Sequence, residues 1–157
     1  MLNQHGSISV NDYLAGERVN EHRSEYVAGK VCVRADSNIN HNRITVNLSA
    51  LLWNALKTTD YCPLGSAMLI KTAPDCFRYP DVVVVCNDDL SQDDYVRERP
   101  ILVVEVISES TRSTDKRLEY IALPSLLEYV LVEQDIAEVT VYRRGSRLII
   151  VWIWGRM

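Results

Sequence analysis

Two runs of branched apolar residues, Val82–Val85 and Ile101–Ile107, most constrain what this chain can fold into. Continuous apolar runs, without alternation between apolar and polar positions, are typical of strands that are buried on both faces of a sheet. Such a sheet must be covered on both sides by other elements. With helices expected between such strands, the runs predict an α/β domain.

The size and composition of the chain fit a single globular domain. Its 157 residues can bury one hydrophobic core, and 47% hydrophobic with 24% charged residues is ordinary for a globular protein. Because no linker or repeat divides the chain, we expect residues 1–157 to form one domain. Its longest apolar stretch is too short to span a bilayer, and its N-terminus lacks a signal-peptide pattern, so we expect a cytoplasmic protein with no membrane partner.

Helices and further strands are expected on both sides of the two apolar runs. Ser9 can cap a first helix that ends at Gly16, and Pro124 ends a third. The helices are expected over residues 11–15, 40–57 and from about 115 to 122. The other strands are expected over residues 25–33, as a hairpin or bent strand with Ala28-Gly29 at the turn, and over 67–72, 128–133 and 137–143. Residues 87–99 are expected to form an exposed polar loop.

Each apolar run carries an acidic residue where burial should exclude one. Asp81 opens directly into the first run, and Glu105 lies in the middle of the second. An ionised carboxylate in such surroundings is costly unless a partner or a metal compensates it. If the two strands are neighbours, both carboxylates can project toward the same edge and offer the oxygen ligands that Mg²⁺ takes in proteins. Lys116 lies downstream, where it would orient water or stabilise charge.

A structural explanation is open for each of these residues. Asp81 can cap a turn after Pro80, and Glu105 can pair with an arginine or a lysine. Lys116 can lie on a solvated helix face, and Tyr120, one helical step further, is expected to serve in packing.

Pro80-Asp81, followed after a spacer by Glu105-Val106-Ile107, resembles the motif of the PD-(D/E)XK nuclease superfamily, with Ile107 in place of the usual lysine. The chain from about Val10 to Arg144 resembles one branch of that superfamily, the Uma-two family of restriction-endonuclease-like proteins. The similar segments are residues 25–31, 40–44, 104–111 and 115–132. No single segment is specific, whereas their order and spacing together are.

The resemblance implies a restriction-endonuclease-like core, in which a mixed sheet is flanked by helices. It also implies a Mg²⁺-dependent endonuclease acting on DNA, with Mn²⁺ as a substitute ion. It carries over Asp81 and Glu105 as metal ligands. Lys116 carries over as the charged catalytic helper, since the superfamily lysine is displaced onto the following helix in this family. Glu25 and His41 carry over as a further acid and a polar group at the cleft, although a strand-start position and helix capping would also explain them.

Other functions stay open beside the endonuclease. One is a non-catalytic module that binds nucleic acid or protein and keeps the nuclease fold; another is a hydrolase of a small phosphorylated substrate. The net charge of −4 argues against a protein that coats nucleic acid non-specifically, but not against a nuclease. Several basic residues can line one face near the site, namely Arg97, Arg99, Arg112, Lys116 and Arg117.

The end of the chain departs from the family pattern. Members usually continue past the strand at residues 139–144 with a further strand and helix, whereas this chain has the apolar run Leu148–Trp154 and stops at Met157. We therefore expect a C-terminus truncated relative to the family. An exposed apolar edge strand is prone to pair with another chain, so we also expect a homodimer contact through Trp152 or Trp154.

Overall fold

The computed structural model describes residues 7–34, 37–89, 93–107, 116–145 and 149–153. Its helices are α1 (Val10–Val19), α2 (Ile39–Leu56) and α3 (Arg117–Ile121). A smaller sheet, in the order β2-β1-β5-β4-β7, contains β1 (Ser24–Val27), β2 (Lys30–Val33), β4 (Leu69–Ala73), β5 (Cys76–Arg78) and β7 (Val96–Arg97). A larger sheet, in the order β11-β10-β9-β8-β6-β3, contains β3 (Tyr61–Gly65), β6 (Val82–Cys86), β8 (Pro100–Ile107), β9 (Glu128–Glu133), β10 (Glu138–Arg143) and β11 (Ile149–Ile153).

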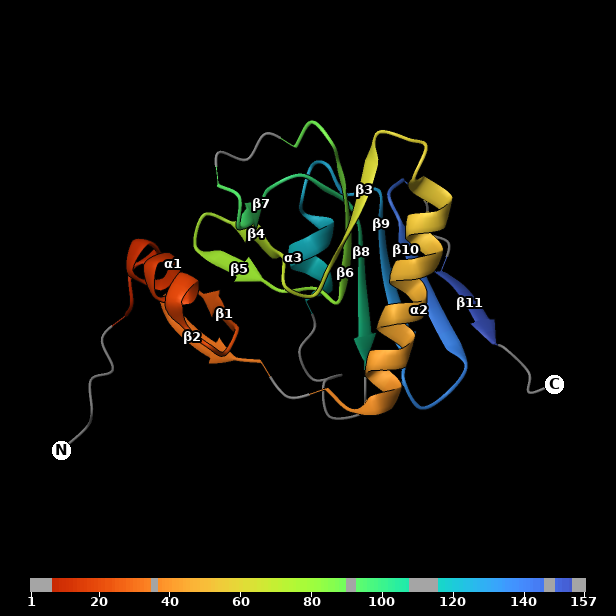
Figure 1. The fold of residues 1–157 in the computed structure, drawn as a ribbon, viewed down its shortest axis with the longest axis horizontal. Helices are drawn as coiled ribbons and strands as arrows, with labels where there is room; N and C mark the ends of the chain where they lie inside the picture. Colours follow the sequence, from red (N-terminus) through yellow and green to blue (C-terminus); the bar gives the residue numbers. More distant parts are fainter. Residues whose placement is uncertain (1–6, 35–36, 90–92, 108–115, 146–148, 154–157) are drawn as a thin grey trace.

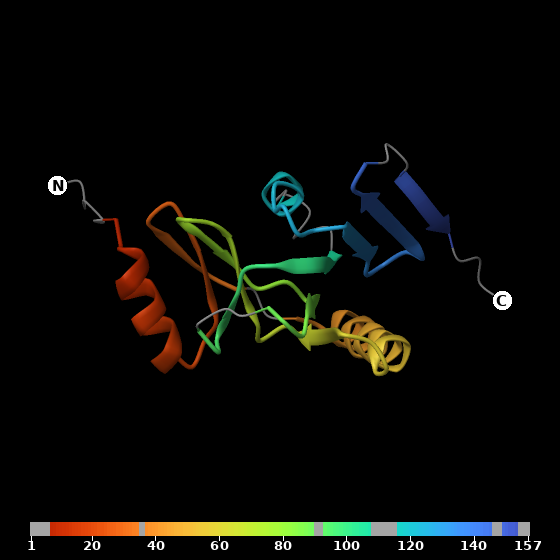
Figure 2. The same ribbon diagram turned by 90° about the horizontal axis from the view of Figure 1, so that it is seen from above.

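The larger sheet is mixed and lies between two helices (Figures 1 and 2). β8 and β9 run parallel, with α3 in the connection between them, and the other neighbouring strands run antiparallel. One face packs against α2 through Val82, Val104, Val106, Ile44 and Leu48. The opposite face packs against the α3 region through Val83, Val103, Tyr120 and Leu123. The expected α/β fold, with a sheet covered on both faces, is confirmed.

The pairing of β6 with β8 fixes the register at the centre of this sheet. Val82 lies opposite Val104 and Val84 lies opposite Leu102. The register then shifts, so that Val85 lies opposite Pro100. This irregularity is at the end of the strand pair away from Asp81.

The smaller sheet packs against α1, and the sequence analysis did not foresee it as a separate sheet. Its core is largely aromatic and consists of Tyr13, Tyr26, Leu69, Phe77, Tyr79 and Val96. β5 has only 3 residues and β7 only 2, which is too short for a periodic pattern to be visible. The prediction of an exposed loop over residues 87–99 is wrong at β7, because Val96 is buried and the strand pairs in parallel with β4.

Helix α1 continues past Gly16, where the sequence analysis expected it to end. Ser9 caps the helix as predicted, since its side chain accepts a hydrogen bond from the Asp12 amide. An internal glycine costs only about 1 kcal/mol. The next residue, Glu17, is buried and its carboxylate accepts hydrogen bonds from the Ser24 amide and the Tyr79 hydroxyl. These tertiary contacts outweigh the local preference to stop.

The hairpin formed by β1 and β2 turns where the sequence analysis expected it. Ala28 and Gly29 both have positive φ, at 46° and 86°. Two consecutive residues of this kind form the tight turn that suits the twist of antiparallel strands. The hairpin brings Glu25 on β1 and Arg34, just past β2, toward the larger sheet.

β11 pairs antiparallel with β10 and forms one end of the larger sheet. The side chains of β11, that of Trp152 included, lie outside the described part of the chain, as does Trp154. Their contact in a homodimer stays a prediction. In the described ranges, no helix combines the length and the hydropathy needed to cross a membrane, and the cytoplasmic location stays a prediction as well.

Candidate active site

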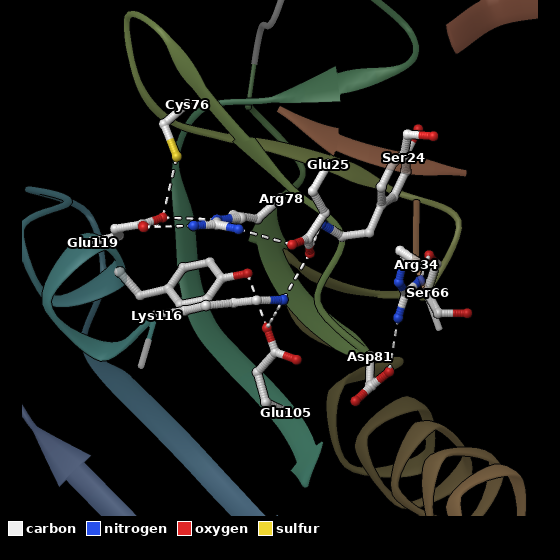
Figure 3. A network of polar contacts seen from close by, with 12 residues as sticks. Ser24, Glu25, Arg34, Ser66, Cys76, Arg78, Asp81, Glu105, Lys116 and Glu119 are labelled. Atoms are coloured by element: carbon white, nitrogen blue, oxygen red, sulfur yellow. Dashed lines mark hydrogen bonds and ion pairs between the residues drawn. The ribbon is translucent and has the colours of Figure 1, made fainter. Parts of the chain in front are cut away.

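The residues that the sequence analysis proposed for the site meet where the two sheets join. Figure 3 shows four of them, Glu25, Asp81, Glu105 and Lys116, and His41 contacts Asp81. Tyr79-Pro80-Asp81 connects β5 of the smaller sheet to β6 of the larger one. The proposed residues come from four elements and one connection, with Glu25 on β1, His41 in the first turn of α2, Asp81 before β6, Glu105 in β8 and Lys116 at the N-cap of α3. Residues distant in sequence thus converge on one junction.

Asp81 and Glu105 lie on neighbouring strands, as the sequence analysis expected. Extending the Val82–Val104 register by one residue places the two acids opposite each other. Residues directly opposite in an antiparallel pair point to the same side of the sheet. Asp81 is 2% exposed and Glu105 is 8% exposed. Oδ2 of Asp81 also accepts a 2.7 Å hydrogen bond from the Val106 amide, which fixes the aspartate against β8.

The Asp81 carboxylate is balanced by two side chains at the rim of the site. Nη2 of Arg34 lies 3.1 Å from Oδ1, and Nε2 of His41 lies 3.2 Å from Oδ2. The hydrogen bond to Asp81 raises the pKa of His41. Arg34 also donates to the Ser66 carbonyl and lies over the Tyr79 ring. The Arg34 side chain is 25% exposed, so its fork is within reach of a bound molecule.

Glu105 has weaker compensation. Its Oε1 accepts a 3.1 Å hydrogen bond from the Tyr120 hydroxyl and lies 3.5 Å from Nζ of Lys116. Burial raises the pKa of Glu105 to about 7; the Lys116 charge opposes the rise, and the negative charges of Asp81 and Glu25 add to it. Glu105 is therefore a buried carboxyl with little positive charge of its own to offset its burial.

The electrostatic surroundings of Glu25 are the opposite of those of Glu105. Its Oε1 is 2.7 Å from Nζ of Lys116 and accepts a hydrogen bond from the Tyr79 amide, and its Oε2 is 2.9 Å from Nη1 of Arg78. Although burial works in the other direction, Lys116 and Arg78 together lower the pKa of Glu25. Arg78 also holds both oxygens of Glu119, at 2.8 and 2.6 Å.

Sequence reasoning missed several members of this network. Arg78 carried a usable signal, because an arginine beside Cys76-Phe77 and a buried Tyr79-Pro80 needs an acidic partner. Tyr120 stacks on Tyr129 as a packing residue does, yet its hydroxyl also binds Glu105. Arg34 and Glu119 gave no local signal, since only the fold brings them to the site.

Of the basic residues expected near the site, Lys116 contacts the predicted acids, whereas the described contacts of Arg97 and Arg99 lie elsewhere. Arg97 donates to the carbonyls of Asp93 and Val96, and Arg99 donates to the carbonyl of Asp88. Both arginines thus bind within their own loop region. Arg112 lies outside the described residues. The arginines that contact the predicted acids are Arg34 and Arg78 instead.

The acids at the junction fit a hard divalent cation. No group of three or more His, Cys, Asp or Glu side chains is arranged to hold a metal within the described ranges. Mg²⁺ does not need such a group, since it usually binds one or two carboxylates together with water and substrate phosphate. Carboxylate oxygens each carry two lone pairs, so the hydrogen bonds of Asp81 and Glu105 leave acceptor capacity. The raised pKa of Glu105 marks charge that a cation would neutralise.

The fold places the chain in the restriction-endonuclease-like class. It superposes with a TM-score of 0.75 on the crystal structure of "a putative nuclease belonging to DUF820" from Anabaena variabilis ATCC 29413. The match covers 92% of this chain and 84% of the other, and 18% of the residues are identical. At that identity the likeness establishes the fold.

The chain belongs to the Uma2 family, described as "Putative restriction endonuclease", which it matches over residues 10–151. Two relatives come from Synechocystis sp. (strain ATCC 27184 / PCC 6803 / Kazusa). Protein sll1609 is 31% identical, over 89% of this chain and 83% of its own length. Protein slr1290 is 32% identical, over 88% of this chain and 75% of its own length. The family resemblance inferred from the sequence is confirmed, and the family description supports nuclease function in general terms.

Proposed function

We propose that the chain is a metal-dependent endonuclease that hydrolyses DNA phosphodiester bonds. The observation that carries this proposal is the pair of buried acids, Asp81 and Glu105, opposed across β6 and β8 with Lys116 beside them. Family membership supports the reaction class. The choice of DNA as substrate and of a metal as cofactor goes beyond that description and is part of the proposal.

Asp81 and Glu105 would hold Mg²⁺, or Mn²⁺ in its place. When bound between them, the ion would supply a water of lowered pKa and neutralise charge on the phosphate. This assignment accounts for the cost of two neighbouring buried anions, because the divalent charge would compensate both.

The side chains around the two acids have distinct tasks in this proposal. Lys116 places a positive charge beside Glu105, where it would orient water and stabilise charge developing on the phosphate. Glu25 holds that ammonium through its 2.7 Å contact. His41 and Arg34 balance Asp81 at the rim, and the positive charge of the partly exposed Arg34 side chain would attract a phosphate group.

A non-catalytic binding module is the second candidate, and one observation favours it. Both oxygens of Asp81 already bind cationic or potentially cationic groups, Arg34 and His41. A buried carboxylate can keep such partners without a metal ion. In that case the arginine, the histidine and Lys116 would serve a surface that binds nucleic acid or protein without cleaving it.

Cleavage assays separate the two candidates. We expect the wild-type protein to cleave supercoiled or single-stranded DNA with Mn²⁺, and Asp81→Asn or Glu105→Gln to reduce the rate about 100-fold or more. Glu98→Gln is the matched control, because Glu98 is exposed and pairs with Lys71 away from the site. Cleavage that persists in both site variants would contradict the assignment of these acids.

Calorimetric titration tests the ion itself. We expect Mn²⁺ or Mg²⁺ to bind the wild-type protein and to bind Asp81→Asn more weakly. No difference between the two proteins, together with DNA binding that needs no metal, would favour the binding module.

The homodimer is a separate part of the proposal. β11 forms one end of the larger sheet, and an edge strand offers backbone groups for pairing with a second copy. Light scattering at high protein concentration should give the mass of a dimer. A monomer under those conditions would remove this part and leave the site unaffected.

A further inference from the structure

We propose that Arg78 is a positioning residue that sets the place of the Lys116 ammonium relative to Glu105. The inference rests on the proposed nuclease function for its catalytic meaning. Its structural content, the dependence of Lys116 on Arg78, can be measured without any DNA cleavage.

Lys116 needs an anchor that Asp81 and Glu105 do not need. The two acids are placed by the register of β6 and β8. Lys116 instead precedes α3, a helix of 5 residues, as an N-cap residue that makes no side-chain capping hydrogen bond. A helix this short is not stable by itself, so its position depends on tertiary contacts.

Arg78 supplies such a contact to α3. Nε and Nη2 of its guanidinium bind Oε2 and Oε1 of Glu119, in the two-pronged geometry that fixes orientation as well as distance. Glu119 lies in α3, three residues after Lys116. The helix that begins at Lys116 is therefore tied to β5 of the smaller sheet.

The Arg78 guanidinium also binds Glu25, the acid that holds the Lys116 ammonium. Nη1 of Arg78 binds Oε2 of Glu25, while Oε1 of Glu25 holds Nζ of Lys116 (Figure 3). Two restraints on the ammonium, one through the helix and one through the glutamate, thus pass through one side chain. The Arg78 side chain is only 8% exposed, so solvent screens these contacts little.

A lysine cannot replace Arg78 in this role. Arg78 uses three nitrogens in fixed directions to reach two carboxylates, whereas a lysine offers one compact ammonium on a flexible stem. Without the fork, Glu25 and Glu119 lose the cation they share, and among the described contacts the Tyr79 amide is then the remaining partner that holds Glu25 beside Lys116.

The test follows the Lys116 ammonium directly, in protein labelled with ¹⁵N-lysine. The chain has lysines at positions 30, 57, 71 and 116, and Lys116→Arg identifies the signal. We expect Arg78→Met and Arg78→Lys to shift or abolish the Lys116 signal, and Glu119→Gln to shift it less. Arg97→Met is the matched control, because Arg97 is a half-buried arginine that binds only nearby carbonyls among its described contacts; it should leave the signal unchanged.

Kinetics provide the second readout. If Arg78 positions Lys116, Arg78→Met should lower kcat about 100-fold, the loss typical of a misplaced catalytic group, with little change in KM. Combined with Glu119→Gln, the effect should be smaller than the product of the two single effects, since both act through one contact.

The outcomes test the positioning role of Arg78 and the proposed nuclease function separately. An unchanged Lys116 signal in Arg78→Met and Glu119→Gln overturns the positioning role, whatever happens to cleavage. A shifted signal in a protein whose wild type cleaves no DNA with any divalent ion supports the positioning role and overturns the nuclease. If Arg78→Met does not fold, the milder Glu119→Gln decides the question, because Glu119 is partly exposed.

Discussion

Glu25 and Glu105 are two buried glutamates that share one lysine, and their electrostatic conditions are opposite. Glu25 lies in the smaller sheet, where Lys116 and Arg78 lower the pKa of its carboxyl although burial opposes them. Glu105 lies in the larger sheet, where burial and the neighbouring acids raise its pKa to about 7. The difference arises because the arginine reaches one glutamate, while an aspartate lies opposite the other.

The comparison separates two uses of an interior acid. A carboxylate that the protein itself neutralises ties elements together, as Glu25 ties β1 to β5 and to Lys116. A carboxylate that the protein leaves short of positive charge can bind a cation from outside, which is the role proposed for Glu105. Breaking the two sites separately should therefore change different properties of the protein.

The largest expected effect on stability is that of Glu25→Gln. This change leaves Arg78 buried without one of its counter-charges and should destabilise the fold by about 3 kcal/mol. Urea denaturation at neutral pH measures the free energy of unfolding. Glu98→Gln at the surface should stay within about 0.5 kcal/mol of the wild type. A Glu25→Gln loss as small as that of Glu98→Gln would remove the distinction between the glutamates.

At alkaline pH and without metal, Glu105→Gln should have the opposite effect and raise the free energy of unfolding. The folded-state pKa of Glu105 is raised from 4.5 to about 7, so the folded protein binds an extra proton between these values. Its stability therefore falls as pH rises through about 7. The glutamine variant lacks this loss and should be more stable than the wild type at pH 8.5, by an amount on the order of 1–3 kcal/mol. The difference should shrink toward pH 4.5, as denaturation across that range would show.

Divalent ions should stabilise the folded wild-type protein at pH values where Glu105 is charged. At a Mn²⁺ concentration ten times the Kd, binding to the folded state adds about 1.4 kcal/mol, or a few degrees in Tm. The gain should be larger at pH 8 than at pH 6, because a protonated carboxyl is a poor ligand. Glu25→Gln should keep this gain and Glu105→Gln should lose it. An equal gain in both variants would place the ion elsewhere.

The smallest effect concerns His41, whose hydrogen bond to Asp81 raises the pKa of its ring. A raised histidine pKa contributes stability that is complete below the unfolded value of 6.5 and is lost as pH rises through the folded value. His41→Asn should therefore cost less than about 1 kcal/mol at pH 6 and still less at pH 8.5. NMR titration of the ring should also show a lower pKa in Asp81→Asn; an unchanged pKa would contradict the contact.

Sequence patterns predicted the strands of the larger sheet, except β3, and the positions of the two acids. The valine-rich runs identified β6 and β8, and a carboxylate inside such a run is visible without coordinates. The pairing partners were not visible in the same way. Arg78 lies three residues before Asp81, but its contacts with Glu25 and Glu119 depend on how the smaller sheet meets α3.

The same limit applies to the smaller sheet as a whole. β5 and β7 are stabilised by neighbouring strands and an aromatic core rather than by their own patterns. Local propensity also failed at Gly16, where a buried glutamate one residue later keeps the helix intact. Sequence reasoning worked where burial is periodic or continuous, and it failed where contacts distant in the chain decide.

The irregularity between Val84 and Val85 has a consequence for how this domain can vary. Between it and the acids, regular pairs such as Val83 with Val103 hold the two strands in step. A slip of one residue there would turn Glu105 to the other face of the sheet. A shift in strand register that arises in the connection over residues 87–99 can instead be absorbed at the irregularity between Val84 and Val85. Lengthening or shortening the part of that connection that precedes β7, whose Val96 is buried, should therefore leave the strand pairing beside Asp81 and Glu105 intact.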